Sequence, residues 1–173
     1  MKQQESTSQP PRALSASLTD IIKGFLRKNQ YLHEFRIQKL IYLAELISVK
    51  KSDTRLTTAD FKPYMYGSYS SDISTALKQL KSEPELETKR DLHHGKVNTV
   101  FLGRSINVDL DDEAEEIIEE ANQIAAAHRS QDLGDWSKQT WLYQSTPYGD
   151  EMNFEQYLSA DSDQLDQDIQ DLK

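Results

Sequence analysis

Apolar residues recur at helical spacing through the first eighty positions of the chain and predict three amphipathic helices. The first begins after Ser17, a residue type suited to an N-cap, and ends near Asn29. The second covers about 34–50, and its apolar stripe is broad enough to predict a buried, central helix. The third covers about 70–80 and begins with serines that can cap it.

After the third helix the hydrophobic pattern changes period. Residues 86–92 and 97–102 alternate as strands do and flank a turn containing Gly95, which predicts a β-hairpin. A further helix starts at Asp109, where acidic residues suit the helix dipole. Residues 132–145 predict another helix, and 152–158 predict one last helical turn.

Polar segments bound this pattern at both ends. Residues 1–16 are rich in Gln, Ser and Pro and predict a disordered arm, and 159–173 predict an acidic, solvated tail. Residues 17–158 are then a single domain. The order helix, helix, helix, hairpin, helix indicates a mainly α fold with a small β-hairpin, a winged-helix-like domain of about five to six helices.

The turn between the second and third helices concentrates aromatic side chains. Tyr64, Tyr66 and Tyr69 fall within six positions, together with Pro63 and Gly67, which indicate an irregular or short extended connection. Tyrosine offers broad contact area at small entropic cost, so the turn is a candidate recognition surface. In the alternative interpretation, Tyr64 and Tyr66 pack beneath the turn and Gly67 only supplies a positive φ.

The composition excludes several kinds of chemistry. There is no cysteine, so neither a disulfide scaffold nor a thiolate site can form. Phosphate-binding glycine loops and hydrolase motifs are absent, so we expect no enzymatic activity and no cofactor. No apolar run approaches the ~18 residues of a membrane span, and the first residues lack the apolar core of a secretory signal. We expect a cytoplasmic protein without a membrane partner.

Two local clusters invite a metal interpretation that their geometry does not favour. His93 and His94 belong to the predicted turn of the hairpin, and adjacent residues of an extended chain point to opposite faces, so they cannot hold one ion together without a bend. Residues 109–113 are acidic but lack the glycine and the terminal glutamate of a calcium loop. We therefore expect no metal site.

Charge is distributed unevenly along the chain. Residues 1–104 carry 17 Lys and Arg against 11 Asp and Glu, whereas 105–173 carry 3 against 18. This asymmetry is typical of a basic binding face followed by an acidic tail. The glutamates at 115–120 indicate a solvated helix face or, alternatively, one that steers a basic partner.

Three segments resemble the Panacea domain family of SocA-like antitoxins and phage-associated proteins, with their YwgA-like relatives. Residues 37–44, Ile-Gln-Lys-Leu-Ile-Tyr-Leu-Ala, are similar to its "KLQKLLYFA" helix. Residues 60–69 resemble its aromatic "YGP" element, with Ser68 in place of the usual proline and Tyr64 where tryptophan is common. Residues 141–154 are weakly similar to its C-terminal aromatic and acidic segment.

The resemblance implies a mostly helical protein, often encoded beside a toxin, that neutralises its partner by direct binding. We therefore expect a non-enzymatic protein-binding module, an antitoxin whose partner is a cognate toxin. The expected partner-binding residues are Tyr64, Tyr66, Gly67, Tyr69, Trp141, Tyr143 and Tyr148.

The alternative function is a winged-helix transcriptional regulator that binds operator DNA and regulates its own operon, with residues 71–81 in the groove and the hairpin as the wing. The candidate recognition helix offers only Lys78 and Lys81 to phosphates. Assembly as a homodimer stays open.

Overall fold

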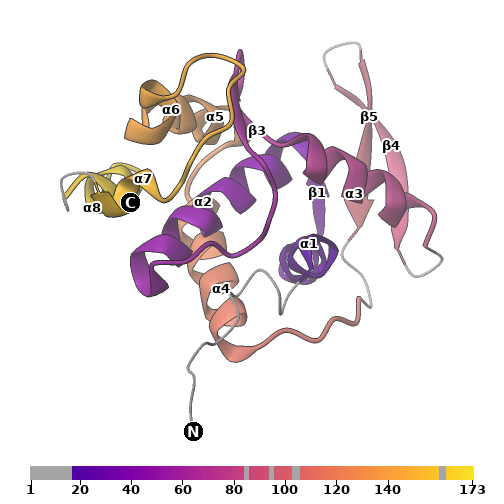
Figure 1. The fold of residues 1–173 in the computed structure, drawn as a ribbon. Helices are drawn as coiled ribbons and strands as arrows, with labels where there is room; N and C mark the ends of the chain where they lie inside the picture. Colours follow the sequence, from indigo (N-terminus) through magenta and orange to yellow (C-terminus); the bar gives the residue numbers. More distant parts are fainter. Residues whose placement is uncertain (1–16, 84–85, 94–95, 103–105, 160–162) are drawn as a thin grey trace, which may run out of the picture.

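The computed structural model describes residues 17–83, 86–93, 96–102, 106–159 and 163–173, so the expected arm at 1–16 lies outside the described residues. The fold is mostly helical (Figure 1). Its helices are α1 (Leu18–Arg27), α2 (Glu34–Ser52), α3 (Ser71–Lys81), α4 (Asp112–Ala126), α5 (Ser130–Gln139), α6 (Trp141–Ser145), α7 (Gln156–Ser159) and α8 (Asp163–Gln170).

Among the described residues, five short strands form two small antiparallel sheets. They are β1 (Tyr31–His33), β2 (Lys62–Tyr64), β3 (Gly67–Tyr69), β4 (Glu87–His93) and β5 (Lys96–Leu102). The predicted hairpin is β4 and β5, and β1, which the pattern did not predict, adds to it in the order β1-β5-β4. Strands β2 and β3 pair separately, so the aromatic turn is itself a hairpin.

Helix α2 is the centre of the fold, as its broad apolar stripe predicted. Every residue from Ile37 to Val49 is buried. Figure 1 shows α2 crossing the molecule, with α1, α4 and the group α5–α8 arranged around it. Burial of one continuous helix on all sides is possible only because neighbouring elements cover each of its faces.

Local signals set the starts of two helices. The Ser17 side chain accepts a hydrogen bond from the Asp20 backbone N–H (3.2 Å), which confirms the predicted cap. Helix α4 begins after Asp111 rather than at Asp109, because the Asp111 carboxylate accepts from the Ala114 N–H (2.7 Å).

The helix predicted over 132–145 is broken into α5 and α6 at Thr140. Thr140 has extended backbone angles (φ −66°, ψ 146°), and its side chain caps α6 by accepting from the Tyr143 N–H. The same hydroxyl lies 2.7 Å from the Tyr42 hydroxyl on α2. The break thus gives a buried tyrosine its polar partner.

The C-terminal segment is folded as α8, so the predicted solvated tail at 159–173 is wrong where the structure describes it. Leu165, Ile169 and Leu172 are buried in the core. Asp168 accepts hydrogen bonds from the Tyr157 hydroxyl (2.6 Å) and the Trp141 N–H (3.0 Å), and its burial raises the pKa of its carboxyl group. The aspartates of the segment obscured an amphipathic helix whose apolar residues recur at i, i+4 spacing.

The glutamates of α4 form ion pairs with the ends of α1 and α2 rather than a wholly solvated face. The pairs are Arg27–Glu115, Lys28–Glu119 and Lys51–Glu120. Much of the acidic charge on this helix therefore faces basic groups of the same chain. In the part of the chain that is described, no helix has the length and apolar character needed to cross a membrane.

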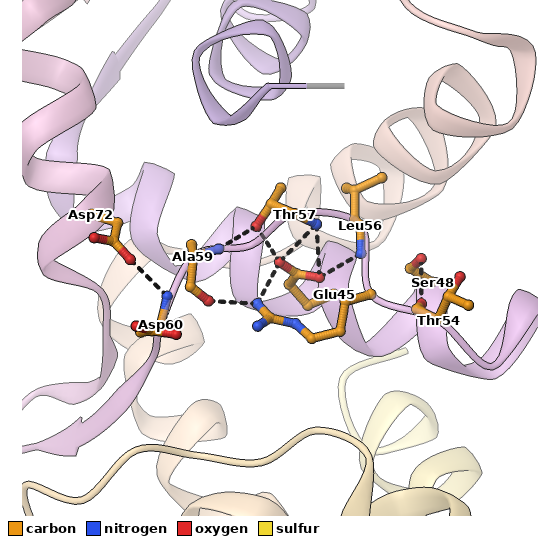
Figure 2. A network of polar contacts seen from close by, with 9 residues as sticks. Glu45, Ser48, Thr54, Leu56, Thr57, Ala59, Asp60 and Asp72 are labelled. Carbon is orange, nitrogen blue, oxygen red and sulfur yellow. Dashed lines mark hydrogen bonds and ion pairs between the residues drawn. The ribbon is translucent and has the colours of Figure 1, made fainter. Parts of the chain in front are cut away.

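A buried carboxylate organises the loop that joins α2 to β2 (Figure 2). Glu45 is 0% exposed, and its oxygens accept from the Leu56 N–H (2.7 Å), the Thr57 hydroxyl (2.5 Å) and the Arg55 guanidinium (2.7 Å). Arg55 in turn donates to the Ala59 carbonyl (2.7 Å). Glu45 thus fixes the path of the chain into the aromatic hairpin.

We predict that Glu45→Gln lowers the free energy of unfolding by about 2–3 kcal/mol, because it removes charge-assisted bonds and leaves Arg55 without its counter-ion. Urea denaturation measures this change. Glu116→Gln, on the exposed face of α4, is the matched control and should change stability by less than about 0.5 kcal/mol. Equal effects of the two substitutions would contradict the role given to Glu45.

Candidate functional site

The hairpin β2–β3 projects the aromatic turn from the body of the protein. Lys62 pairs with Tyr69 and Tyr64 with Gly67, so Met65 and Tyr66 form the tip. Tyr66 is 70% exposed, which contradicts the interpretation that it packs beneath the turn.

Gly67 has a φ of +112°, as the alternative interpretation of the turn required. A Cβ atom at this position would lie 2.2 Å from Ser137 Oγ and 3.0 Å from the Gly134 carbonyl oxygen, both on α5. The hairpin therefore presses directly against α5, and only glycine permits that approach.

The C-terminal aromatic segment meets the hairpin on the same surface. The Tyr64 ring lies edge-on to Tyr69 (5.5 Å between centroids) and to Tyr148 (5.7 Å). The Tyr143 hydroxyl donates to the Tyr64 carbonyl (2.6 Å), and the Gly149 N–H donates to the Pro63 carbonyl (3.1 Å). Two segments about eighty residues apart thus build one aromatic cluster.

Burial raises the pKa of the Tyr143 hydroxyl, and neighbouring Tyr148 raises it further. The hydroxyl therefore keeps the proton that it donates to the hairpin. Of the sequence-predicted residues, Trp141 stands apart from this cluster. Its ring contacts Tyr157 (5.2 Å), which belongs to the buried α7–α8 region. We call Tyr64, Tyr66, Tyr69, Tyr143 and Tyr148 the tyrosine face.

A pocket of about 370 Å³ lies between this hairpin and the start of α2. Its walls are predominantly apolar, and sequence reasoning missed the four residues that α2 contributes to them. The lining residues are Glu34, Phe35, Gln38, Lys39, Tyr64, Tyr66, Gly67 and Tyr69, and we call this cavity the Lys39 pocket.

Lys39 is the unusual group in this pocket, since it is only 2% exposed. Its ammonium donates to the Ser68 carbonyl (2.6 Å) and lies 4.7 Å from the centre of the Phe35 ring. Desolvation lowers the pKa of Lys39 to about 8, and repulsion by Lys138 contributes. Among the described residues, no carboxylate lies within ion-pair distance of this ammonium.

Polar contacts of α2 hold the rest of the pocket wall. The Gln38 amide forms two bonds with the backbone of Ser70, accepting from its N–H and donating to its carbonyl (2.9 Å each). The Glu34 carboxylate accepts from the Ser74 hydroxyl, which lies 2.6 Å from the Tyr69 hydroxyl. The wall is therefore a connected network rather than a set of independent side chains.

No grouping of side chains able to hold a metal ion occurs among the described residues. His93 is the last residue of β4, where it pairs with Lys96, and its side chain and His94 lie outside the described part of the structure. The groups that the site offers are apolar surface, tyrosine hydroxyls and one buried ammonium.

A family model described as "Antitoxin SocA-like, Panacea domain" matches residues 37–142, more than half of the chain and a range that includes most of α2, the aromatic hairpin and α5. Neither the curated proteins nor the solved structures gave a match.

Two glycines provide a matched test of the hairpin's position. Gly149→Ala should cost about 1 kcal/mol of stability, since its φ is +82° but nothing lies within 4 Å of the added methyl. Gly67→Ala should cost about 3 kcal/mol, because overlap with α5 is added to the backbone strain. Denaturant unfolding measures both, and equal costs would show that the hairpin does not press on α5.

Proposed function

Because the chain belongs to the antitoxin SocA-like, Panacea domain family, we propose that it neutralises a cognate toxin protein by direct binding and catalyses no reaction itself. The observation that carries this proposal is the tyrosine face, together with Met65 at the hairpin tip. Tyr66 and Tyr148 are 70% and 68% exposed, and Met65, next to Tyr66 at the hairpin tip, is 65% exposed. Exposed apolar side chains that gather on one surface mark protein interaction sites.

The face is held in place before any partner arrives. Backbone pairing within β2–β3, the contact of Gly67 with α5 and the Tyr143 hydrogen bond each fix the hairpin from a different side. A preorganised surface loses little conformational entropy on binding, so more of the contact energy contributes to affinity. We propose that Gly67 shapes this surface, whereas Trp141, whose ring packs on Tyr157, lies outside it.

A second candidate function is DNA binding, and the order of the elements favours it. Helices α1, α2 and α3 with strands β1, β4 and β5 follow one another as in a winged helix-turn-helix domain, with β5 between β1 and β4. The charge of α3 argues against this function. The Asp72 carboxylate lies at the start of α3, where it accepts from the Asp60 N–H (2.8 Å), and the basic residues of α3 are Lys78 and Lys81. A helix that contacts phosphates normally carries a denser basic stripe.

Co-expression with the product of a neighbouring reading frame tests the antitoxin function. The wild-type chain should restore growth of cells that express a toxic neighbour, and the purified proteins should form a complex. Tyr66→Ala should weaken that complex about thirtyfold, the effect of losing one hot-spot residue. Because Tyr66 is exposed and makes no hydrogen bond among the described residues, the substitution should leave stability unchanged.

Tyr31→Ala is the matched control, since Tyr31 is also exposed (57%) but lies on β1, outside the tyrosine face. Full rescue by Tyr66→Ala would exclude this face as the binding surface. Failure of the wild-type chain to neutralise any neighbour would contradict the antitoxin function. Binding to upstream DNA that weakens steeply with salt would instead favour the regulator.

A further inference from the structure

The Lys39 pocket contains a charge that the protein itself leaves largely uncompensated. A lysine ammonium has three N–H donors, and the structure provides one acceptor, the Ser68 carbonyl, and the face of the Phe35 ring. Burying an ammonium with so few partners costs free energy that the fold must supply. A buried ammonium with too few acceptors, on the wall of an open cavity, therefore indicates a ligand that supplies the missing acceptor.

Each wall of the cavity limits which ligand can fit. Phe35, Tyr64, Tyr66 and Tyr69 offer aromatic surface, which suits an apolar or aromatic group. The ammonium at Lys39 suits an anion, and the strongest short contact for it is a carboxylate. The volume of about 370 Å³ is near the lower limit of the ~300–1,000 Å³ of ligand pockets, enough for one side chain and its backbone.

Glu34 limits the charge of the anion that the pocket can accept. Its carboxylate lines the same pocket, where the Ser74 hydroxyl and the Gln38 amide (3.4 Å) already donate to it. A dianion such as a phosphate monoester would meet this negative charge, whereas a single carboxylate is repelled less strongly. The pocket therefore suits a monoanion with an attached apolar group better than a phosphate.

We propose that the Lys39 pocket binds an apolar side chain carried beside a carboxylate on the partner protein, and that the carboxylate pairs with Lys39. The segment that carries these groups is an aromatic or aliphatic residue next to Asp or Glu, or at a chain terminus. The partner's identity as a toxin rests on the proposed function, but the chemistry of the pocket does not. Exposed Tyr66 belongs both to the lining of the Lys39 pocket and to the tyrosine face, so the pocket and the face are parts of one surface.

Small probes test the pocket without the toxin. N-acetyl-phenylalanine and its neutral amide have the same ring and differ in the carboxylate, and we expect the acid to bind with a dissociation constant on the order of 1 mM. Titration followed by amide chemical shifts should place it at residues 34–39 and 64–69. The acid should bind at least about fivefold more tightly than the amide, the effect of one charge-assisted contact.

Lys39→Met keeps the length and apolar character of the side chain but removes its charge. It should reduce the ratio of acid to amide affinity to about one, whereas Lys78→Met on the exposed face of α3 should leave the ratio unchanged. Equal binding of acid and amide to the wild type, or shifts confined to β4–β5, would overturn the proposal. So would the absence of pocket shifts with either probe.

The pH dependence gives a second readout that needs no variant. The charged and titratable groups around Lys39 are Glu34 on α2, Lys138 on α5 and the three tyrosines of the hairpin. With a Lys39 pKa of about 8, the ammonium is mostly protonated at pH 7 and mostly neutral at pH 9. Because the acid binds at least about fivefold more tightly than the amide only while Lys39 is charged, acid affinity should fall at least about threefold over this interval, toward that of the amide, while amide affinity stays constant. A parallel change in both affinities would overturn the assignment.

The outcomes of these experiments distinguish a failure of the pocket proposal from a failure of the antitoxin proposal. Selective binding of the acid without neutralisation of any toxin would retain the pocket chemistry and reject the antitoxin role. Neutralisation that survives Lys39→Met, together with equal acid and amide binding, would retain the antitoxin role and reject the pocket as the anchor.

Discussion

The burial of α2 together with its polar side chains is the constraint on which the rest of the fold depends. A helix enclosed on every side can keep polar groups only if other segments supply hydrogen-bond partners. Here each of the buried polar side chains has a partner outside the helix, often far along the chain. The contacts are Gln38 with Ser70, Lys39 with Ser68, Tyr42 with Thr140, Glu45 with Leu56 and Thr57, and Ser48 with Thr54. The polar residues of α2 therefore position the loops around it.

This constraint explains how the aromatic hairpin is held in position. Gln38 and Lys39 bind the backbone of the hairpin and of the residue after it, and Glu45 binds the loop before it. The backbone of the hairpin is thus held at both ends by one helix. Lys39 differs from its neighbours because one carbonyl does not satisfy the three N–H donors of an ammonium. The proposed ligand would supply an acceptor for the remaining donors.

Much of the fold was predictable because its signals are local. The helices α1, α2 and α3, the β4–β5 hairpin and the Ser17 cap follow from periodicity and capping chemistry. The mostly helical class and the family were also predicted correctly. The break at Thr140 was not predictable, because its cause is a contact with Tyr42 on another helix. Helix α8 was missed because its aspartates dominate the composition, while only Leu165 and Ile169, with Leu172 just after the helix, reach the core.

The candidate site, too, was predictable from the sequence only in part. Its aromatic residues were visible as a cluster at 64–69, and the structure brings Tyr143 and Tyr148 to them. The pocket was not visible, because Lys39 lies in a helix that reads as core and its environment is created by the hairpin. A lysine within an otherwise buried stripe is the one signal that could have indicated it.

Hydrogen–deuterium exchange of the chain, alone and in complex with its toxin, directly shows whether the aromatic hairpin and the Lys39 pocket contact the partner. If the aromatic hairpin and the Lys39 pocket form the interface, backbone amides at 62–70 and 143–149 should gain protection in the complex, and those of β4–β5 should not. Protection confined to α3 and β4–β5, with the aromatic hairpin unchanged, would contradict this interface and show that α3 and β4–β5 bind the partner instead.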